Sequence, residues 1–249
     1  MYPILLHLGK INIYSHGVMM ILGMAIGGYI AYRFAKIHSL KTELLWDTII
    51  WSVLFGIIGA RVLYILLYPE QFLVWQDFFS IWNGGMVSYG GMVGGIVAAI
   101  IFLRHKKQPI LFWFDATITG LLAGWAVGRV GCFLDSDDLG LATNSVFGVW
   151  GRWPTPLFES VALVLAVILM FFLFLRFNKT AFHGLFFSLG IMLYAVLRFF
   201  VDITKAEDMI LGPLKYGQVG ALILFVAGGL LLAILAVSHK KMRKENKWS

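Results

Sequence analysis

The sequence has a single cysteine among 249 residues, which excludes an internal disulfide framework. Cysteine and histidine form no pattern with metal-ligand spacing, and we expect neither a metal nor a cofactor. Charged residues are scarce too, at 13% of the chain against about 25% in a typical soluble domain. These shortages argue against a disulfide-stapled secreted scaffold and against an ordinary soluble enzyme.

Apolar residues take the place of the missing charges. Hydrophobic side chains make up 60% of the chain, and the mean hydropathy is +0.84. The 21 Phe, nine Trp and nine Tyr are typical of a membrane protein with aromatic belts at both interfaces. The net charge of +7 would suggest nucleic acid as the partner of a soluble protein. In a membrane protein the net charge instead reflects the uneven distribution of basic residues among the loops, which sets the orientation. We therefore expect no nucleic-acid partner.

Seven apolar runs organise the chain, most of them near the roughly 20 residues that a bilayer span requires. They cover residues 17–36, 46–68, 88–103, 111–134, 157–175, 182–201 and 216–237. The N-terminus has no charged segment and no small-residue cleavage site, so we expect no removable signal peptide. The runs predict an all-α polytopic membrane protein in which residues 1–249 form one transmembrane domain of about seven helices.

Lysine and arginine predict the orientation. Thirteen of the 20 basic residues fall in the first, third and fifth connections and the C-terminal segment, and four fall on the opposite face. Cytoplasmic loops carry such an excess, so the N-terminus is expected outside and the C-terminus inside.

The stretch 120–138 places Arg129 inside an apolar run and follows it with Asp135, Asp137 and Asp138. A charge at membrane depth costs at least about 2.5–3.5 kcal/mol at a helix centre, so it requires a partner, water or an anionic ligand. The planar guanidinium suits phosphate or carboxylate. The alternative is an arginine near the helix end that snorkels to the headgroups and pairs with an aspartate.

Two further arginines, Arg61 and Arg198, lie near the outward ends of the second and sixth runs. Three cations at similar depth predict one anion-binding pocket, open to the outer leaflet, for a phosphate group. The alternative is three separate snorkelling arginines.

The connection at about 69–89 is strongly apolar and aromatic, which predicts an arm or loop in the outer interface. A lid, a lipid gate and a packed loop all fit this composition. Residues 83–95 follow with a glycine-rich sequence, whose second half fits close helix packing. Gly84 and Gly85 precede the helix, where free backbone N–H groups suit an anion, and Tyr89 can point its phenol there.

These segments resemble a known family. Residues 83–94, Asn-Gly-Gly-Met-Val-Ser-Tyr-Gly-Gly-Met-Val-Gly, are similar to the Gly-Gly-Met…His-Gly-Gly segment of the bacterial prolipoprotein diacylglyceryl transferases. Residues 128–135, Gly-Arg-Val-Gly-Cys-Phe-Leu-Asp, resemble that family's Gly-Arg-hydrophobic-Gly-Asn-Phe-hydrophobic-Asn. Residues 153–159, Trp-Pro-Thr-Pro-Leu-Phe-Glu, look like its His-Pro-Ser/Thr-Gln-Leu-Tyr-Glu.

The resemblance continues in order along nearly the whole chain. Residues 194–202 match Tyr-Gly-x-x-Arg-x-x-x-Glu, residues 216–218 match a late Gly-Gln, and Arg61 matches an arginine of the second helix. Tyr14 and His16 stand where the family has His-x-Tyr-Gly with the two side chains exchanged. The family's histidine before Gly-Gly is Tyr89 here, and its two asparagines are Cys132 and Asp135.

The resemblance implies a bacterial inner-membrane transferase whose active site faces outward. Its partners would be phosphatidylglycerol, other membrane phospholipid, and an exported prolipoprotein with a lipobox cysteine. The diacylglyceryl group would pass to that cysteine thiol as glycerol phosphate leaves. Arg129 and Arg198 would stabilise the phosphate charge. Tyr89 would donate a hydrogen bond and His16 would act as a base, although an interfacial histidine fits His16 equally well.

The remaining candidate residues are assigned to substrate binding. They are Arg61, Tyr14, Asn83, Gly84, Gly85, Asp135, Asp138, Glu159, Asp202 and Gln218. The carboxylates would orient the arginines or act as bases, and solvated loop charges are the alternative. Cys132 is interpreted as a small packed residue. Two other functions stay open: a relative that binds phospholipid or uses another acceptor, and a small-anion transporter.

Overall fold

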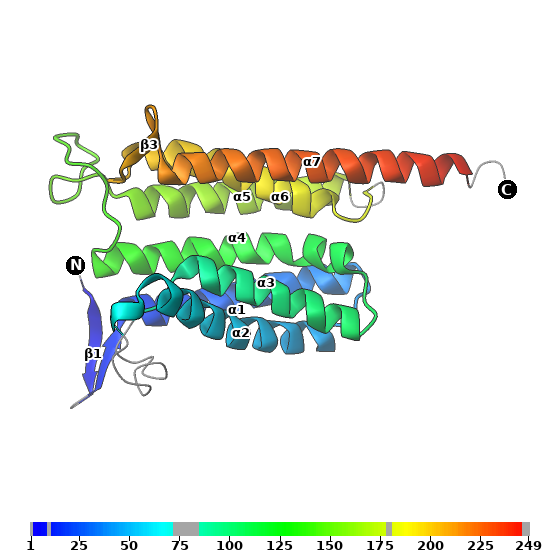
Figure 1. Ribbon diagram of the computed structural model, residues 1–249, viewed down its shortest axis with the longest axis horizontal. Helices are drawn as coiled ribbons and strands as arrows, with labels where there is room; N and C mark the ends of the chain where they lie inside the picture. Colours follow the sequence, from blue (N-terminus) through cyan, green and yellow to red (C-terminus); the bar gives the residue numbers. More distant parts are fainter. Residues whose placement is uncertain (1, 9–10, 72–84, 178–180, 246–249) are drawn as a thin grey trace. The chain divides into compact units, whose positions relative to one another are not determined.

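The computed structural model describes residues 2–8, 11–71, 85–177 and 181–245. Helices dominate this part of the chain (Figure 1). They are α1 (Ser15–Ile37), α2 (Glu43–Leu67), α3 (Ser88–His105), α4 (Ile110–Asp135), α5 (Thr155–Phe177), α6 (Leu185–Val201) and α7 (Tyr216–Glu245). The first six begin and end within about three residues of the apolar runs, because each run stops where polar loop residues begin. The last helix, α7, continues past its run into the basic C-terminal segment.

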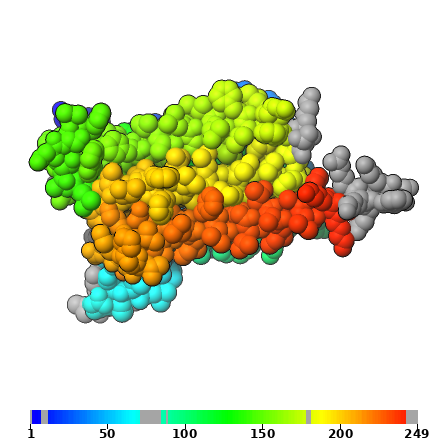
Figure 2. Space-filling view, turned by 90° about the horizontal axis from the view of Figure 1, so that it is seen from above, coloured from blue at the N-terminus to red at the C-terminus, as the bar shows by residue number. Residues whose placement is uncertain are grey.

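The prediction of an all-α polytopic membrane protein is confirmed. Six helices of the described chain are long and apolar enough to cross a membrane, and α3 is a shorter apolar helix. Large apolar side chains stay exposed along them, such as Ile50 at 63%, Leu230 at 60% and Ile234 at 63%. Figure 2 shows the outer surface of α7, in orange to red, lying beside α6. Lipid tails are the solvent that such a surface requires.

Short elements connect the helices. An antiparallel hairpin of β1 (Ile4–Leu8) and β2 (Ile11–Tyr14) precedes α1. A second hairpin, β3 (Met209–Leu211) with β4 (Leu214–Lys215), precedes α7, and the 3-10 helix η4 (Asp202–Thr204) follows α6. The 3-10 helix η1 (Pro69–Gln71) follows α2. The expected arm at about 69–89 falls largely on residues 72–84, which lie outside the described residues.

The chain divides into two compact units, which are described separately. The first contains Met1–Phe34 and Phe114–Ser249, and the second contains Ala35–Trp113. The second unit is built on a close contact between α2 and α3, in which Gly59 faces the backbone of Gly90 and Gly94. A side chain at these positions would push the helices apart, so the packing role that the glycine spacing predicts is confirmed.

In the first unit, α1 and α4 approach through another glycine contact. The Cβ of any side chain at Gly27 would overlap the backbone carbonyl of Gly120. Aromatic packing then joins α1 to α5 and α6, with the rings of Phe34 and Phe174 at 4.6 Å and those of Phe174 and Phe186 at 5.2 Å. The helices of this unit therefore hold the ends of α4, α5 and α6 in a fixed arrangement.

Asp115 joins the beginning of α6 to α4. Its side chain is buried and accepts hydrogen bonds from the backbone N–H groups of Gly184 at 2.6 Å and Phe187 at 2.7 Å. Asp115 lies inside α4 and caps the N-terminus of α6, where free N–H groups require an acceptor.

Candidate active site

Arg129 lies in the next-to-last turn of α4 and is only 8% exposed. Its Nη2 atom lies 2.7 Å from Asp138 Oδ2 and 2.8 Å from Glu159 Oε2. The buried guanidinium therefore has two carboxylate partners, which offset the cost of removing it from water. The expectation that Arg129 requires an anionic partner is met by residues of this chain.

Glu159 links Arg129 and Arg198, the two candidate arginines of the first unit. It lies in the second turn of α5, is 2% exposed, and its Oε2 atom also accepts a hydrogen bond from Arg198 Nη1 at 2.8 Å. Its other oxygen accepts the indole N–H of Trp125 at 3.0 Å. Because one carboxylate contacts both guanidinium groups, Arg129 and Arg198 converge on the same point.

Arg198 lies in the last turn of α6, where its charge favours the C-terminal end of the helix. Its Nε atom lies 2.9 Å from Oδ2 of Asp202, one turn further along, and Asp202 is fully buried. The Nη2 atom of Arg198 lies 4.0 Å from Oε1 of Glu207. The i,i+4 spacing of Arg198 and Asp202 is the neighbour relation that a helical face requires.

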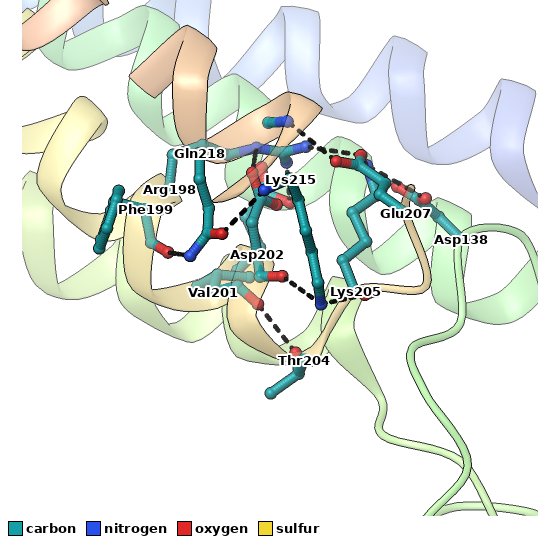
Figure 3. A network of polar contacts seen from close by, with 12 residues as sticks. Asp138, Arg198, Phe199, Val201, Asp202, Thr204, Lys205, Glu207, Lys215 and Gln218 are labelled. Carbon is teal, nitrogen blue, oxygen red and sulfur yellow. Dashed lines mark hydrogen bonds and ion pairs between the residues drawn. The ribbon is translucent and has the colours of Figure 1, made fainter. Parts of the chain in front are cut away.

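Lys205 closes the network through the loops. Its ammonium lies 3.3 Å from Asp138 Oδ1 and 2.7 Å from Glu207 Oε1. The cluster thus contains the cations Arg129, Arg198 and Lys205 and the carboxylates Asp138, Glu159, Asp202 and Glu207. We call these seven side chains the ionic network; Figure 3 shows the part of it around α6, η4 and the following hairpin.

Two of its carboxyls lie in loops outside the spans, and their surroundings favour the charged form. Burial by itself would raise the pKa of Asp138, but the hydrogen bond from Arg129 and the charge of Lys205 outweigh it and lower the pKa below the ordinary value. Burial opposes ionisation of Glu207 as well. The hydrogen bonds from Lys205 and the backbone N–H of Gly217 still lower the pKa of Glu207.

A set of hydrogen bonds to backbone groups, which we call the supporting frame, holds this end of α6 (Figure 3). The ammonium of Lys215, 7% exposed, donates to the backbone carbonyls of Asp202 at 3.1 Å, Ile203 at 2.9 Å and Lys205 at 2.6 Å. Gln218 accepts the N–H of Lys215 at 3.1 Å and donates to the carbonyl of Phe199 at 3.4 Å. These bonds occupy carbonyls that a helix end leaves without intrahelical partners.

A thiol and an imidazole lie against the other side of Arg129. The Sγ atom of Cys132 is 3.5 Å from Arg129 Nη1 and 3.7 Å from Nδ1 of His16, which is in the first turn of α1. Cys132 is buried and His16 is half-buried. The interpretation of Cys132 as a small packed residue omitted this contact, since 116 positions separate the two residues in the sequence.

The second unit contains the other arginine candidate. Arg61, in α2, donates from Nη1 to the backbone carbonyl of Gly85 at 2.8 Å, and Gly85 adopts the left-handed backbone at φ 76° that glycine tolerates. Tyr89, in the first turn of α3, is 72% exposed. Arg61 and Gly85 therefore meet where α2 faces the beginning of α3, and Tyr89 follows with its side chain exposed.

The structure brings together five of the predicted residues directly: Arg129, Arg198, Asp138, Glu159 and Asp202. Gln218 lies in the supporting frame, and His16 contacts Cys132 beside Arg129. Tyr14 ends β2 at 54% exposure, and Asp135 ends α4 half-buried, both outside the ionic network. Asn83 and Gly84 lie outside the described residues.

Two residues of the ionic network, Lys205 and Glu207, had no place among the predicted site residues. The same holds for Lys215, in the supporting frame, and Trp125, which donates to Glu159. One signal was available for Lys205, which follows Arg198 by seven positions, two helical turns, and so continues the face of Asp202. Lys215 and Glu207 look like ordinary loop charges in the sequence, and only the chain fold brings them to α6.

The comparisons with known proteins match this chain over nearly its whole length. A family model described as prolipoprotein diacylglyceryl transferase matches residues 3–234. The chain belongs to the prolipoprotein diacylglyceryl transferase family. Membership accounts for the order of the motifs along the helices, and it identifies a multi-pass membrane protein of a bacterial transferase family.

Individual transferases of the family cover the chain almost completely. The phosphatidylglycerol–prolipoprotein diacylglyceryl transferase of Clostridioides difficile (strain 630) is 31% identical over 95% of this chain and 94% of its own length. The enzyme of that name from Oleidesulfovibrio alaskensis is 31% identical over 96% of this chain and 94% of its own. The one from Finegoldia magna is 28% identical, over 93% of each chain.

Proposed function

We propose that this protein transfers the diacylglyceryl group of phosphatidylglycerol to the lipobox cysteine thiol of an exported prolipoprotein. The relatives named above act, by their names, on phosphatidylglycerol and prolipoproteins. The reaction takes place at the outer leaflet of the bacterial cytoplasmic membrane. The basic residues Lys106 and Lys107 precede α4, and Arg129 lies near its opposite end, which supports an outward-facing site under the positive-inside rule.

The transfer is a substitution at a glycerol carbon. The thiol sulfur forms a bond to the carbon of the diacylglyceryl group that carries the phosphate, and the bond from this carbon to the phosphate oxygen breaks. The electron pair leaves with glycerol phosphate, and the thiol proton passes to a base. Negative charge therefore collects on the departing phosphate oxygen as the reaction proceeds, and it requires fixed cations nearby.

The observation that carries the proposal is the shared contact of Arg129 and Arg198 with Glu159. Two guanidinium groups from different helices are held at one point by buried carboxylates, so their positions are set before substrate arrives. Such preorganised donors stabilise developing charge without reorganisation during the reaction. In this proposal Arg129 and Arg198 bind the phosphate, and Asp138, Glu159, Asp202 and Gln218 orient them.

The remaining candidates take the following roles in this proposal. His16 takes the thiol proton, and Tyr89 donates a hydrogen bond to the donor lipid. Arg61 and Gly85 bind the lipid in the second unit. Tyr14, Asp135, Asn83 and Gly84 are each proposed to contact the substrate, and the segment at about 69–89 is proposed to lie on the outer face as an arm of the single transmembrane domain.

The decisive assay uses the purified protein in micelles with phosphatidylglycerol and a lipobox peptide that carries one cysteine. We expect release of glycerol phosphate and attachment of the diacylglyceryl group to the peptide. Arg129→Gln and Arg198→Gln should each slow the release by about 100-fold or more, as the loss of one preorganised charge-stabilising donor does in other enzymes. Arg152→Gln, an exposed arginine of the loop before α5, is the matched control and should retain wild-type activity.

The outcomes separate the alternatives. A peptide with serine in place of cysteine should give no release, because an alcohol is a far poorer nucleophile than a thiolate at neutral pH. Release that persists without a thiol would indicate another acceptor. Phospholipid that copurifies with a protein that never releases glycerol phosphate would indicate a lipid-binding relative instead.

A further inference from the structure

The two arginines proposed to bind phosphate are occupied by carboxylates of the same chain. Arg129 contacts Asp138 and Glu159, and Arg198 contacts Glu159 and Asp202. Three cations and four carboxylates give the ionic network a net charge of −1, and the nearby ammonium of Lys215 brings the cluster to zero. A phosphodiester adds one negative charge to this partly buried cluster, where unbalanced charge is costly. Exchange of one carboxylate for the phosphodiester leaves the charge unchanged.

Asp138 has the geometry of a phosphate substitute. Its Oδ2 atom lies 2.7 Å from Arg129 Nη2, and its Oδ1 atom lies 3.3 Å from Lys205 Nζ. One oxygen on each of two cations is the arrangement that two non-bridging oxygens of a phosphodiester adopt between basic side chains. Arg129 has capacity for such an anion, because its buried Nε atom donates no hydrogen bond to any residue that the structure describes.

The other three carboxylates are held more firmly than Asp138. Glu159 and Asp202 are 2% and 0% exposed. Glu207 accepts the backbone N–H of Gly217 at 2.9 Å in addition to its ion pairs. The side chain of Asp138 is 27% exposed, and its residue lies in the turn after α4 with a left-handed backbone, at φ 64°.

We infer that Asp138 occupies the phosphate position between Arg129 and Lys205 in the ligand-free protein and that an incoming phosphate monoester or diester displaces it. The inference rests on the proposed function for the identity of the natural ligand, the phosphodiester of the donor lipid. Asp138 then weakens phosphate binding by competition. It favours release of the glycerol phosphate product, because the carboxylate returns to the cations as the product leaves.

The test measures binding of glycerol phosphate and of inorganic phosphate to the purified protein in neutral detergent, through the rise in Tm with ligand concentration. Asp138→Asn removes the competing charge and keeps the size of the side chain. If the carboxylate holds the site nine-tenths of the time, the variant should bind glycerol phosphate about tenfold more tightly than the wild type. Asp137→Asn, a change at the exposed neighbouring residue, is the matched control and should bind as the wild type does.

Asp138→Ser is a second variant, which guards against an effect of the amide itself and should also bind more tightly. Wild-type or weaker binding in both variants overturns the inference, because it means that Asp138 only orients Arg129. A separate transferase assay distinguishes this failure from that of the proposed function. If the variants bind phosphate more tightly but no protein transfers the diacylglyceryl group, the inference holds and the proposed function is wrong. If transfer is observed but the variants bind phosphate as the wild type does, the proposed function holds and the inference is wrong.

Discussion

The thiol of Cys132 lies 3.7 Å from Nδ1 of His16 and 3.5 Å from a guanidinium nitrogen of Arg129. Both Cys132 and His16 stand at positions where the sequence departs from the family pattern, and the structure shows that the two departures contact each other. The contact fixes one nitrogen of the imidazole, which leaves the other available to a substrate thiol.

This relationship predicts that polarity at position 132 matters more than volume. Cys132→Ser keeps a hydrogen-bonding group beside His16 and should retain transfer within about threefold, whereas Cys132→Val should lower kcat about tenfold, since a general base loses efficiency when its ring is not oriented. The measurement is the steady-state rate of glycerol phosphate release. Equal rates for the two variants, or a faster rate with valine, would show that Cys132 only fills space.

Glu159→Gln should destabilise the protein strongly. Removal of the shared carboxylate leaves no anion between the like charges of Arg129 and Arg198, although Asp138 and Asp202 still pair with them. The loss of one partner of a buried ion pair typically costs about 3–5 kcal/mol. Denaturant-induced unfolding in detergent, followed by circular dichroism, measures this change. Glu70→Gln, at an exposed carboxylate of η1, serves as the control and should leave the free energy of unfolding nearly unchanged.

Lys215→Met should loosen the end of α6 while it keeps most of the buried apolar volume. The substitution removes three hydrogen bonds to backbone carbonyls, each worth roughly 1 kcal/mol. The carbonyl of Asp202 keeps the N–H of Lys205 as a donor. We expect a lower Tm and slower transfer through the displaced Lys205. Lys240→Met, an exposed lysine of α7, should change neither quantity. A Lys215→Met protein with the wild-type Tm would contradict the assigned role.

Gly27→Val should separate α1 from α4, because any Cβ at this position overlaps the carbonyl of Gly120. The expected result is a lower Tm and poor recovery of folded protein from the membrane. Gly17→Ala provides the comparison, since the space around its Cβ is open, and it should be tolerated.

The stability of the first unit should fall at acidic pH. The pKa values of Asp138 and Glu207 are lowered from ordinary values of 3.8 and 4.5, so their contribution is fully present above those values. It is lost as the pH falls through the lowered values in the folded state. The double change Asp138→Asn with Glu207→Gln should reduce the fall in Tm as the pH is lowered from 6 to 3. An unchanged fall in Tm would show that other groups cause the loss of stability at acidic pH.

The helices were predictable because each apolar run is bounded by polar residues, and Arg129 stood out as a charge inside such a run. The motif matches pointed to Glu159 and Asp202 as its companions. The sequence does not show which charged loop residues lie against the helix ends. The roles of Lys215 and Glu207 and the contact between His16 and Cys132 could therefore be identified only from the structure. The hairpin of β1 and β2 escaped prediction because its strands are only five and four residues long and precede a strong helical signal.

Asp115 and Lys215 act on opposite ends of the same helix. The carboxylate from α4 holds the first N–H groups of α6, and the ammonium from β4 holds the last carbonyls beyond it. Sliding or rotation of α6 would break charge-assisted bonds at both ends simultaneously, so these bonds hold the helix in place. Arg198, in the last turn of α6, is therefore held in place as well. We therefore expect the lipid to move to Arg198 while α6 keeps its position.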